Sequence, residues 1–322
     1  MRDKILILTQ DFDPMADRLV VELGQRNVEC IRWHTDGLTA TSTVEMSFAR
    51  DCEQLSVTAH GRSFASEEIR SVWNRRQEPL KLPDRLSESE TDFAKSEMSA
   101  LLFGVVRTSN WCWVNHPDRN RYASAKPLQL SVARRLGLEI PRTCITNDPR
   151  AAQSFIRQCA GRAIYKTLYS PYLADTDMAC FTSVVNEDHL SQLDAIQFTG
   201  GIFQEYVPKK FELRITIIGS HVFATEIHSQ DLEETRVDWR RSSTMALKHV
   251  DHALPFEIDR KCRALVAAFG LTYSAMDMIV TPDGDYVFLE NNPSGQYGWI
   301  EDLTGAPLTA SLADLLIAGE PD

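Results

Sequence analysis

The sequence is short of three things that each mark a class of protein: positive charge, paired cysteines and long apolar runs. Its 322 residues include 34 Lys and Arg against 45 Asp and Glu, a formal net charge of −11. This argues against a general nucleic-acid-binding protein, because such a protein needs a basic face to displace counterions from phosphate. The seven cysteines form no Cys-x-x-Cys pair and are odd in number, which is typical of reduced thiols. No apolar run approaches the roughly 18 residues of a membrane span, and we find no signal sequence. We therefore expect a cytoplasmic protein that binds neither nucleic acid nor membrane.

Glycine is absent from the first turn of the chain. The apolar run Ile5–Leu8 predicts a buried parallel strand, and Pro14 begins a predicted helix that ends near Gly24 and Asn27. The turn between them, residues 9–13, contains no glycine. A dinucleotide pyrophosphate needs glycines there for close backbone approach, so a Rossmann cofactor site is disfavoured. The composition itself is ordinary for a globular protein, and the length predicts two or three domains.

The rest of the N-terminal third alternates short strands and turns. Residues 44–72 predict strands, residues 84–106 an amphipathic helix, and Trp111–Asn115 a further short strand. The motif Trp73-Asn74-Arg75-Arg76 has two interpretations: it could line an anion or peptide site, or it could be a solvated strand end. His116-Pro117 breaks the last strand, and we expect a domain boundary near it.

The middle of the chain predicts two helices and a strand that carries a lysine. One helix begins at Lys126-Pro127 and ends at Gly137, and a second is capped by Asn147 or Asp148, with Ala151, Phe155 and Cys159 on its buried face. In the strand 163–168, Lys166 lies within an apolar run. Such a charge is costly unless it is paired, so Lys166 either faces a polyphosphate or points to solvent from an edge strand. The polar segment Tyr169–Asp177 predicts a loop that could close over a ligand.

Polar and apolar residues alternate along the strand that follows Lys210. Glu212, Arg214 and Thr216 share one face, and this pattern alone also fits a face exposed to solvent. The next strand, 222–227, forms a hairpin with it. The charged stretch Ser229–Arg241 then predicts an exposed excursion or a partner-binding hairpin.

Two carboxylates and an amide bracket a predicted hairpin near the C-terminus. Asp277 lies within the apolar strand 273–280, and Pro282–Asp285 form a turn into the strand 286–293. Glu290 and Asn292 are two residues apart and face the same side, where Asp277 can lie opposite them. Three oxygen ligands of this kind suit Mg²⁺, which takes its remaining ligands from phosphates and water. In the alternative interpretation, Asp277 is a buried, hydrogen-bonded carboxylate.

This pattern resembles a known superfamily. Asp277 with Glu290-x-Asn292, together with Lys126 and Lys166, is similar to the ATP-contacting and metal-binding residues of the ATP-grasp carboxylate–amine ligases. The resemblance is closer to one branch, the graspetide (microviridin-type) synthetases, which are ATP-grasp maturases of ribosomal peptides. The motifs that carry it span nearly the whole chain: Trp73-Asn74-Arg75-Arg76, Asn115-His116-Pro117, Lys126–Leu130, Pro141-Arg142-Thr143, Thr146-Asn147-Asp148, Gln204–Val207, Lys210–Arg214, Leu289–Gln296, Trp299-Ile300-Glu301, Thr304-Gly305 and Leu312–Leu316.

The resemblance implies an α/β protein with the ATP-grasp fold and an N-terminal pre-ATP-grasp domain. Residues 1–115 would form that domain, 116–200 the central subdomain and 201–322 the C-terminal subdomain with the metal site. It implies ATP and Mg²⁺, with the following roles: Lys126 and Lys166 on the phosphates; Glu205, Tyr206 and Val207 at the adenine; Glu212 at the ribose; Arg214 at the transferred phosphoryl group; Arg240 or Arg241 on the substrate carboxylate; Asp277, Glu290 and Asn292 on the metal. No dedicated general base is visible, and His228 is a candidate whose structural role is favoured.

The implied activity is macrocyclisation of a precursor peptide. ATP would phosphorylate an Asp or Glu side chain, and a Thr or Ser hydroxyl or a Lys amine would then displace phosphate to form an ester or an amide. The leader of the precursor would bind away from the active site, with residues 225–241 as a candidate docking hairpin, and the protein would be a homodimer. Two alternatives stay open: a ligase that joins free amino acids or adds glutamate to a protein, and a nucleotide-binding regulator without turnover.

Overall fold

A computed structural model describes residues 2–35, 41–76, 80–169 and 179–319. The chain folds into two compact units. The first comprises residues 1–120, 270–273 and 307–322, and the second residues 121–269 and 274–306. Apart from Tyr169, the predicted loop Tyr169–Asp177 lies outside the described residues. The predicted division into residues 1–115, 116–200 and 201–322 stays a prediction.

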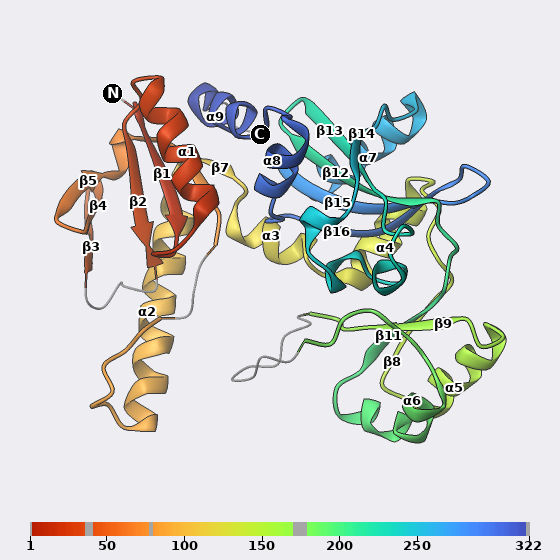
Figure 1. Ribbon diagram of the computed structural model, residues 1–322. Coiled ribbons are helices and arrows are strands. Elements are labelled where there is room, and N and C mark those ends of the chain that lie inside the picture. The colour runs from red at the N-terminus through yellow and green to blue at the C-terminus, as the bar shows by residue number, and fades with distance from the viewer. Residues whose placement is uncertain (1, 36–40, 77–79, 170–178, 320–322) are drawn as a thin grey trace. The chain divides into compact units, whose positions relative to one another are not determined.

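A parallel sheet forms the core of the first unit (Figure 1). Its strand order is β2-β1-β6-β7, and Ile5–Leu8 are completely buried in it, as their apolar run predicted. The helix α1 begins at Pro14 because the Asp13 carboxylate accepts hydrogen bonds from the N–H groups of Met15 and Ala16. The elements are β1 (Lys4–Thr9), α1 (Pro14–Gln25), β2 (Cys30–His34), β6 (Ile69–Asn74) and β7 (Cys112–Val114).

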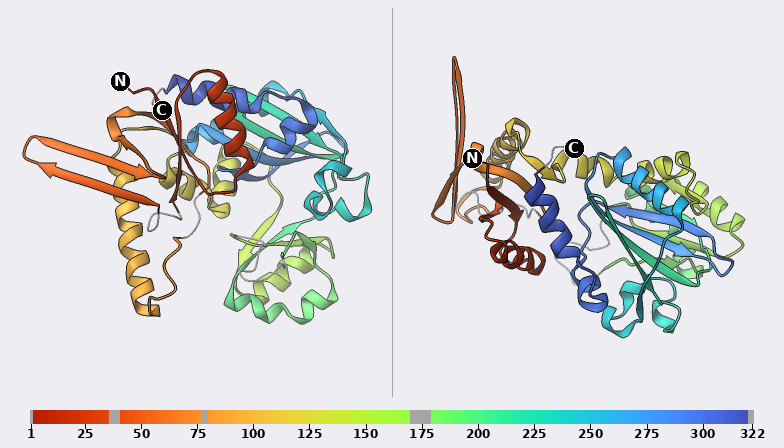
Figure 2. Two further views of the ribbon diagram at one scale, coloured as in Figure 1. Left: turned by 60° about the vertical axis from the view of Figure 1, so that its left-hand side comes forward. Right: turned by 90° about the horizontal axis from the view of Figure 1, so that it is seen from above.

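A helix from the far end of the chain completes this unit. Helix α9 (Leu308–Ala318) packs on α1 and β6 (Figure 2). The Ser71 hydroxyl donates a hydrogen bond to the Leu316 carbonyl at 2.6 Å, and Arg26 pairs with Asp314. The remaining elements are an antiparallel sheet of β3 (Ser42–Ala49), β4 (Cys52–Ala59) and β5 (Arg62–Ala65), the predicted helix α2 (Glu88–Thr108), and α3 (Pro117–Ala123), which leads into the second unit.

The Trp73–Arg76 motif is not a solvated strand end. Asn74 and Arg75 are 9% and 6% exposed. The Arg75 Nε lies 3.3 Å from the Asp13 carboxylate, and its guanidinium lies over the Trp73 ring. A buried arginine needs such a partner, since an uncompensated charge is strongly destabilising. Arg75 therefore helps to fix the carboxyl end of the parallel sheet.

The second unit contains two sheets. The smaller has the order β10-β9-β11-β8, so β9 is an inner strand and the edge-strand interpretation of Lys166 is wrong. Helix α5 packs on it through Ala152, Ile156 and Cys159, not through Ala151 as predicted, because residues 152, 155, 156 and 159 form the stripe that faces the sheet. The elements are β8 (Thr143–Thr146), α5 (Pro149–Gln158), β9 (Ala163–Lys166), β10 (Ser183–Val184), α6 (Glu187–Ser191) and β11 (Gly201–Glu205).

The larger sheet has the order β14-β13-β12-β15-β16. Every residue of β12 is buried, including Glu212, Arg214 and Thr216, so the interpretation of that face as solvent-exposed is wrong. Helix α4 packs on β16 and on α7. The elements are α4 (Lys126–Arg135), β12 (Phe211–Ile218), β13 (His221–Ile227), β14 (His249–Asp251), α7 (Phe256–Ala268), β15 (Tyr273–Val280), β16 (Tyr286–Asn292) and α8 (Gly298–Thr304).

Residues 229–241 do not form a hairpin or a freely exposed excursion. They contain two short 3₁₀ turns, Glu233–Thr235 and Trp239–Arg241, and Ser229, Thr235 and Asp238 are buried. Side-chain hydrogen bonds to the backbone hold this segment, and they take the role that a strand ladder would have in a hairpin. Within the described part of the chain, no helix is both long and apolar enough to cross a membrane.

Candidate active site

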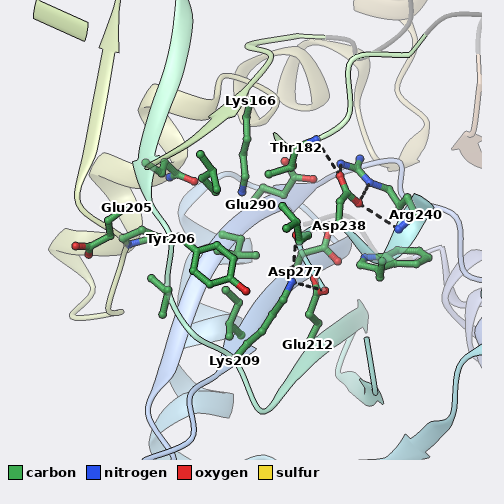
Figure 3. A pocket seen from close by; sticks show the side chains of 18 of the residues that line it. Lys166, Thr182, Glu205, Tyr206, Lys209, Glu212, Asp238, Arg240, Asp277 and Glu290 are labelled. Atoms are coloured by element: carbon green, nitrogen blue, oxygen red, sulfur yellow. Dashed lines mark hydrogen bonds and ion pairs between the residues drawn. The ribbon is translucent and has the colours of Figure 1, made fainter. Parts of the chain in front are cut away.

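A pocket in the second unit collects most of the predicted site residues (Figure 3). Its walls come from β9 and β11 of the smaller sheet, from β12, β15 and β16 of the larger sheet, and from residues 237–240. The predicted residues that line it are Lys126, Lys166, Glu205, Tyr206, Val207, Glu212, Arg240, Asp277 and Glu290. Arg214, Arg241 and Asn292 are not among the lining residues.

Asp277 and Glu290 lie opposite each other in the predicted hairpin. They are register partners on the antiparallel strands β15 and β16, with an irregularity after Asp277. Asn292 is paired with Ala275 further along the strand, is exposed, and accepts a hydrogen bond from the Ser294 N–H. The structure therefore brings two of the three predicted ligands together at the pocket.

Arg214 pairs with Asp277 across two neighbouring strands. Its Nη1 lies 2.9 Å and 3.0 Å from the two carboxylate oxygens, and its Nη2 donates to the Gln296 carbonyl at 3.2 Å. Burial raises the pKa of Asp277 above its ordinary value, although the Arg214 charge opposes this shift. Arg214 thus neutralises one member of the acid pair from behind the pocket wall.

Two lysines reach the other acid. The Lys126 ammonium, at the start of α4, lies 3.2 Å from the Glu290 carboxylate and also donates to the Thr167 carbonyl. Burial raises the pKa of Glu290, but the charges of Lys126 and Lys166 outweigh it, and the pKa lies below its ordinary value. Burial in turn lowers the pKa of the Lys166 ammonium, against the opposing charge of Glu290. The pocket thus places cations directly beside a carboxylate.

Residues 205–207, expected at the adenine, present their backbone to the pocket. The N–H groups of Glu205 and Tyr206 donate to the carbonyls of Arg142 and Arg162. No residue in the described ranges accepts a hydrogen bond from the Val207 N–H. The Glu205 carboxylate accepts from the Arg142 N–H and is turned away from Asp277 and Glu290 (Figure 3). A planar heterocycle in this part of the pocket would meet backbone groups.

Lys209 is a site residue that the sequence reasoning missed. Its ammonium is buried, lies 2.6 Å from the Glu212 carboxylate and donates to the Val237 carbonyl at 3.2 Å. Burial raises the pKa of Glu212, and Lys209 opposes this shift. The available signal was a lysine three residues before an acid on a strand face, next to a second lysine that is exposed.

The two predicted substrate-binding arginines are engaged by the protein itself. Arg240 donates through Nε and Nη2 to Asp238 at 2.8 Å and 2.7 Å. Arg241 Nη2 donates to the Thr182 carbonyl and to the Ser183 hydroxyl. Asp238 was also missed, because nothing in the local pattern distinguished it from the surrounding surface charges.

His228 lies outside the residues that line the pocket. Its Nε2 shares a hydrogen bond of 2.9 Å with the Glu226 carboxylate, and its ring packs against Phe211. The structural interpretation of this histidine is therefore the one that its contacts support.

Residues 4–121 match the family model of the MvdD pre-ATP grasp domain. A search of curated proteins returned no match.

Solved structures that match nearly the whole chain include three from two organisms. A RiPP-associated ATP-grasp ligase from Chryseobacterium gregarium, in complex with ADP and a leader and core peptide, is 30% identical, with a TM-score of 0.91 over 99% of this chain and 98% of that one. The macrocyclase MdnC from Microcystis aeruginosa, bound with its precursor peptide MdnA, is 31% identical, with a TM-score of 0.87 over 98% and 99%. The macrocyclase MdnB from the same organism is 27% identical, with a TM-score of 0.82 over 98% and 99%.

These likenesses confirm the α/β ATP-grasp fold with its pre-ATP-grasp region. RiPPs are ribosomally synthesised and post-translationally modified peptides. On this identity and coverage, the chain belongs to the RiPP-associated ATP-grasp ligases, the graspetide synthetases.

Proposed function

We propose that this ligase uses Mg-ATP to join Asp or Glu side chains of a ribosomal precursor peptide to Thr or Ser hydroxyls, as esters, or to Lys amines, as amides. The observation that carries the proposal is the pocket in which the Asp277–Glu290 pair faces Lys126 and Lys166. Further support comes from two relatives at least 30% identical, one in complex with a leader and core peptide and the other bound with a precursor peptide.

The donor set fits a divalent cation at this pair. The carboxylates of Asp277 and Glu290 lie opposite each other, whereas the amide oxygen of Asn292 accepts from the Ser294 N–H outside the residues that line the pocket. A pair of carboxylates suits Mg²⁺, which binds few protein carboxylates and takes its other ligands from phosphates and water. When bound, Mg²⁺ would supply charge neutralisation at the β- and γ-phosphates.

The chain's own residues would orient the nucleotide. Val207 would offer its backbone N–H to the adenine, and Glu212, held by Lys209, would bind the ribose. Lys126 and Lys166 would bind the phosphates, in place of the contact that Lys126 makes with Glu290. Phosphoryl transfer depends on such positioning and charge neutralisation more than on covalent catalysis by the protein.

The reaction would proceed in two displacements on the peptide. A carboxylate oxygen of the peptide attacks the γ-phosphorus, and ADP leaves. A hydroxyl or amine then attacks the acyl carbon of the acylphosphate, losing its proton as phosphate leaves. Arg240, which lines the pocket, would stabilise the negative charge that develops on the phosphoryl oxygens, and Arg214 would add positive charge from behind Asp277. The peptide loses the elements of one water for each ring.

A direct experiment tests this function. The protein is incubated with the precursor peptide encoded beside it, with ATP and Mg²⁺, and the peptide mass is measured. We expect the peptide to lose the mass of one water for each ring, and we expect one ADP to form for each ring. An unchanged peptide mass while ATP is consumed would contradict the proposal, and so would a mass gain from added glutamate.

Two partner assignments belong to the same proposal. We propose that the leader of the precursor docks near residues 225–236, ahead of the pocket-lining residues 237–240, and that the enzyme is a homodimer. Exchanging the leader for an unrelated sequence should abolish ring formation, and light scattering should give twice the mass of one chain. A monomeric mass for the active enzyme would rule out the dimer.

A further inference from the structure

Asp238 is the most heavily hydrogen-bonded carboxylate around the pocket and has no role in the proposed chemistry so far. Its two oxygens accept from the N–H of Thr182, from the N–H of Arg240, and from Nε and Nη2 of the Arg240 guanidinium, at 2.7–3.1 Å. Its side chain is only 3% exposed. Burial raises its pKa, but the hydrogen bonds and charge of Arg240 outweigh this and lower the pKa of Asp238 to about 2. The carboxylate is therefore ionised throughout the physiological range.

This arrangement fixes the direction of Arg240. Two donors on one edge of the guanidinium are used by a carboxylate of the same chain, two residues away. Such a bidentate pair sets the plane of the guanidinium as well as its position. The expected role of Arg240, binding the substrate carboxylate with that edge, would require Asp238 to leave a buried site where it also binds two backbone N–H groups.

The segment around Asp238 is anchored to both sheets of the second unit. On one side, Asp238 accepts from the Thr182 N–H, and Arg241 donates to the Thr182 carbonyl and the Ser183 hydroxyl beside β10. On the other side, Lys209 donates to the Val237 carbonyl from the start of β12. Residues 237–240 thus line the pocket while hydrogen bonds tie their segment to both sheets, and Asp238 and Arg240 lie beside Thr182 (Figure 3).

Arg240 shares the pocket with the acid pair. Its side chain lines the same cavity as Asp277 and Glu290. An arginine held in this pocket can stabilise the negative charge on the phosphoryl oxygens during phosphoryl transfer. Its usefulness depends on being aligned before the substrate arrives.

We infer that Asp238 is a positioning residue, which holds the Arg240 guanidinium in the wall of the pocket that Asp277 and Glu290 also line, and ties it to the Thr182 backbone. The inference rests on the proposed function, because it assigns Asp238 a part in phosphoryl transfer to the peptide.

Asp238→Asn removes one of the two acceptor oxygens and the charge. Oδ1 accepts from the N–H and Nε of Arg240, and Oδ2 accepts from the Thr182 N–H and the Arg240 Nη2. The amide oxygen can keep one of these sets, whereas the amide nitrogen cannot accept, so the bidentate pair with the guanidinium is lost. We expect kcat for ring formation to fall by roughly tenfold to a hundredfold, with KM for ATP little changed. Arg240→Lys, which keeps the charge and loses the fork, should reproduce this pattern.

The double variant is the decisive measurement. If Asp238 acts through Arg240, Asp238→Asn combined with Arg240→Lys should be no slower than Arg240→Lys alone. Asp259→Asn, which breaks an exposed pair with Arg263 on α7, is the matched control and should leave kcat unchanged.

Each outcome has one meaning. Absence of rings with the wild-type enzyme would overturn the proposed function. Rings in the wild type, with additive losses in the double variant or an unchanged kcat in Asp238→Asn, would overturn the positioning role alone. Because Arg240 is partly exposed, Arg240→Lys tests the role even where Asp238→Asn folds poorly.

Discussion

At the scale of single residues, the pocket depends on opposite charges that hold one another until a substrate arrives. Arg214 forms an ion pair with Asp277, Lys126 with Glu290, and Lys209 with Glu212. An anion that binds the lysines and a cation that binds the acids would replace these pairs together. Such a site avoids the large penalty of leaving any one of these charges buried and alone.

Glu290→Gln should abolish most of the ring formation. The substitution keeps the size of the side chain and removes the charge that faces Lys126 and Lys166. We expect a loss of at least about a hundredfold in kcat, measured by peptide mass against time. Glu257→Gln, at an exposed ion pair on α7, is the control. Wild-type rates in Glu290→Gln would refute the assignment of this carboxylate to the metal.

Gly295→Ala should weaken activity through Arg214. A Cβ at this position would lie 2.7 Å from the Arg214 Nη2 and 2.5 Å from the Ala275 Cβ, closer than atoms approach. Arg214 must therefore shift, and we expect kcat to fall by roughly tenfold to a hundredfold. Gly24→Ala, where a Cβ meets nothing within 4 Å, should leave kcat unchanged.

Asp238 also gives the protein a defined acid sensitivity. Its folded-state pKa is lowered from 3.8 to about 2, so its stabilisation is complete above about pH 5 and is lost as the pH falls through 2. We expect Asp238→Asn to be less stable than the wild type by about 2 kcal/mol at pH 7. Urea unfolding between pH 4 and pH 2 should show this difference shrinking. A difference that stays constant would contradict the assignment.

At the scale of elements, a buried glutamine on α4 holds the strand that carries Glu290. The Gln129 amide nitrogen donates to the carbonyls of Ala123 and Asn291 at 2.7 Å, and its oxygen accepts from the Asn291 N–H at 3.0 Å. It is 2% exposed. Strand β16 lies at the edge of its sheet, and the Gln129 side chain makes the hydrogen bonds to the Asn291 backbone that a neighbouring strand would otherwise make.

Gln129→Leu should lower both stability and activity. It leaves the Asn291 N–H and carbonyl buried without a partner, at a cost of at least about 2 kcal/mol in the free energy of unfolding. Denaturant unfolding and kcat measure the two effects. Gln153→Leu, at an exposed position on α5, is the control and should change neither.

Elements defined by local pattern could be predicted from the sequence, and those defined by tertiary contacts could not. The β15–β16 hairpin and its facing acids followed from alternation and a strong turn, both of which are local. The polar face of β12 looked solvent-exposed because its cover comes from residues distant in the chain. Residues 237–240 show no hydrophobic periodicity, so their position in the pocket wall could not be predicted from the sequence pattern.

At the scale of the whole molecule, the net charge of −11 and an anion-binding pocket are compatible. The cations needed for phosphate are few and local, and most of the acidic residues lie elsewhere on the surface. The charge therefore says little about the ligand, whereas the placement of Lys126, Lys166 and Arg240 says much.

The first unit should not fold from its own N-terminal segment. Although residues 4–121 match a domain model, α9 covers α1 and β6. Residues Leu308, Leu312 and Leu316 are completely buried there. We expect a fragment of residues 1–121 to unfold at low denaturant or to aggregate, and the same fragment fused to residues 307–322 through a flexible linker to unfold cooperatively. Circular dichroism with urea measures both, and equal stability of the two would contradict the prediction.

The discontinuity of this unit has a consequence for the nascent chain. Domains usually fold in the order in which they leave the ribosome, but here the first sheet is made long before the helix that covers it. At about 5–20 residues per second, the interval between residues 120 and 307 is roughly 10 to 40 s. During that time the apolar side of α1 has no cover from α9, and the second unit can fold first. Helix α9, which is translated after the whole of the second unit, is the segment that covers α1 and β6.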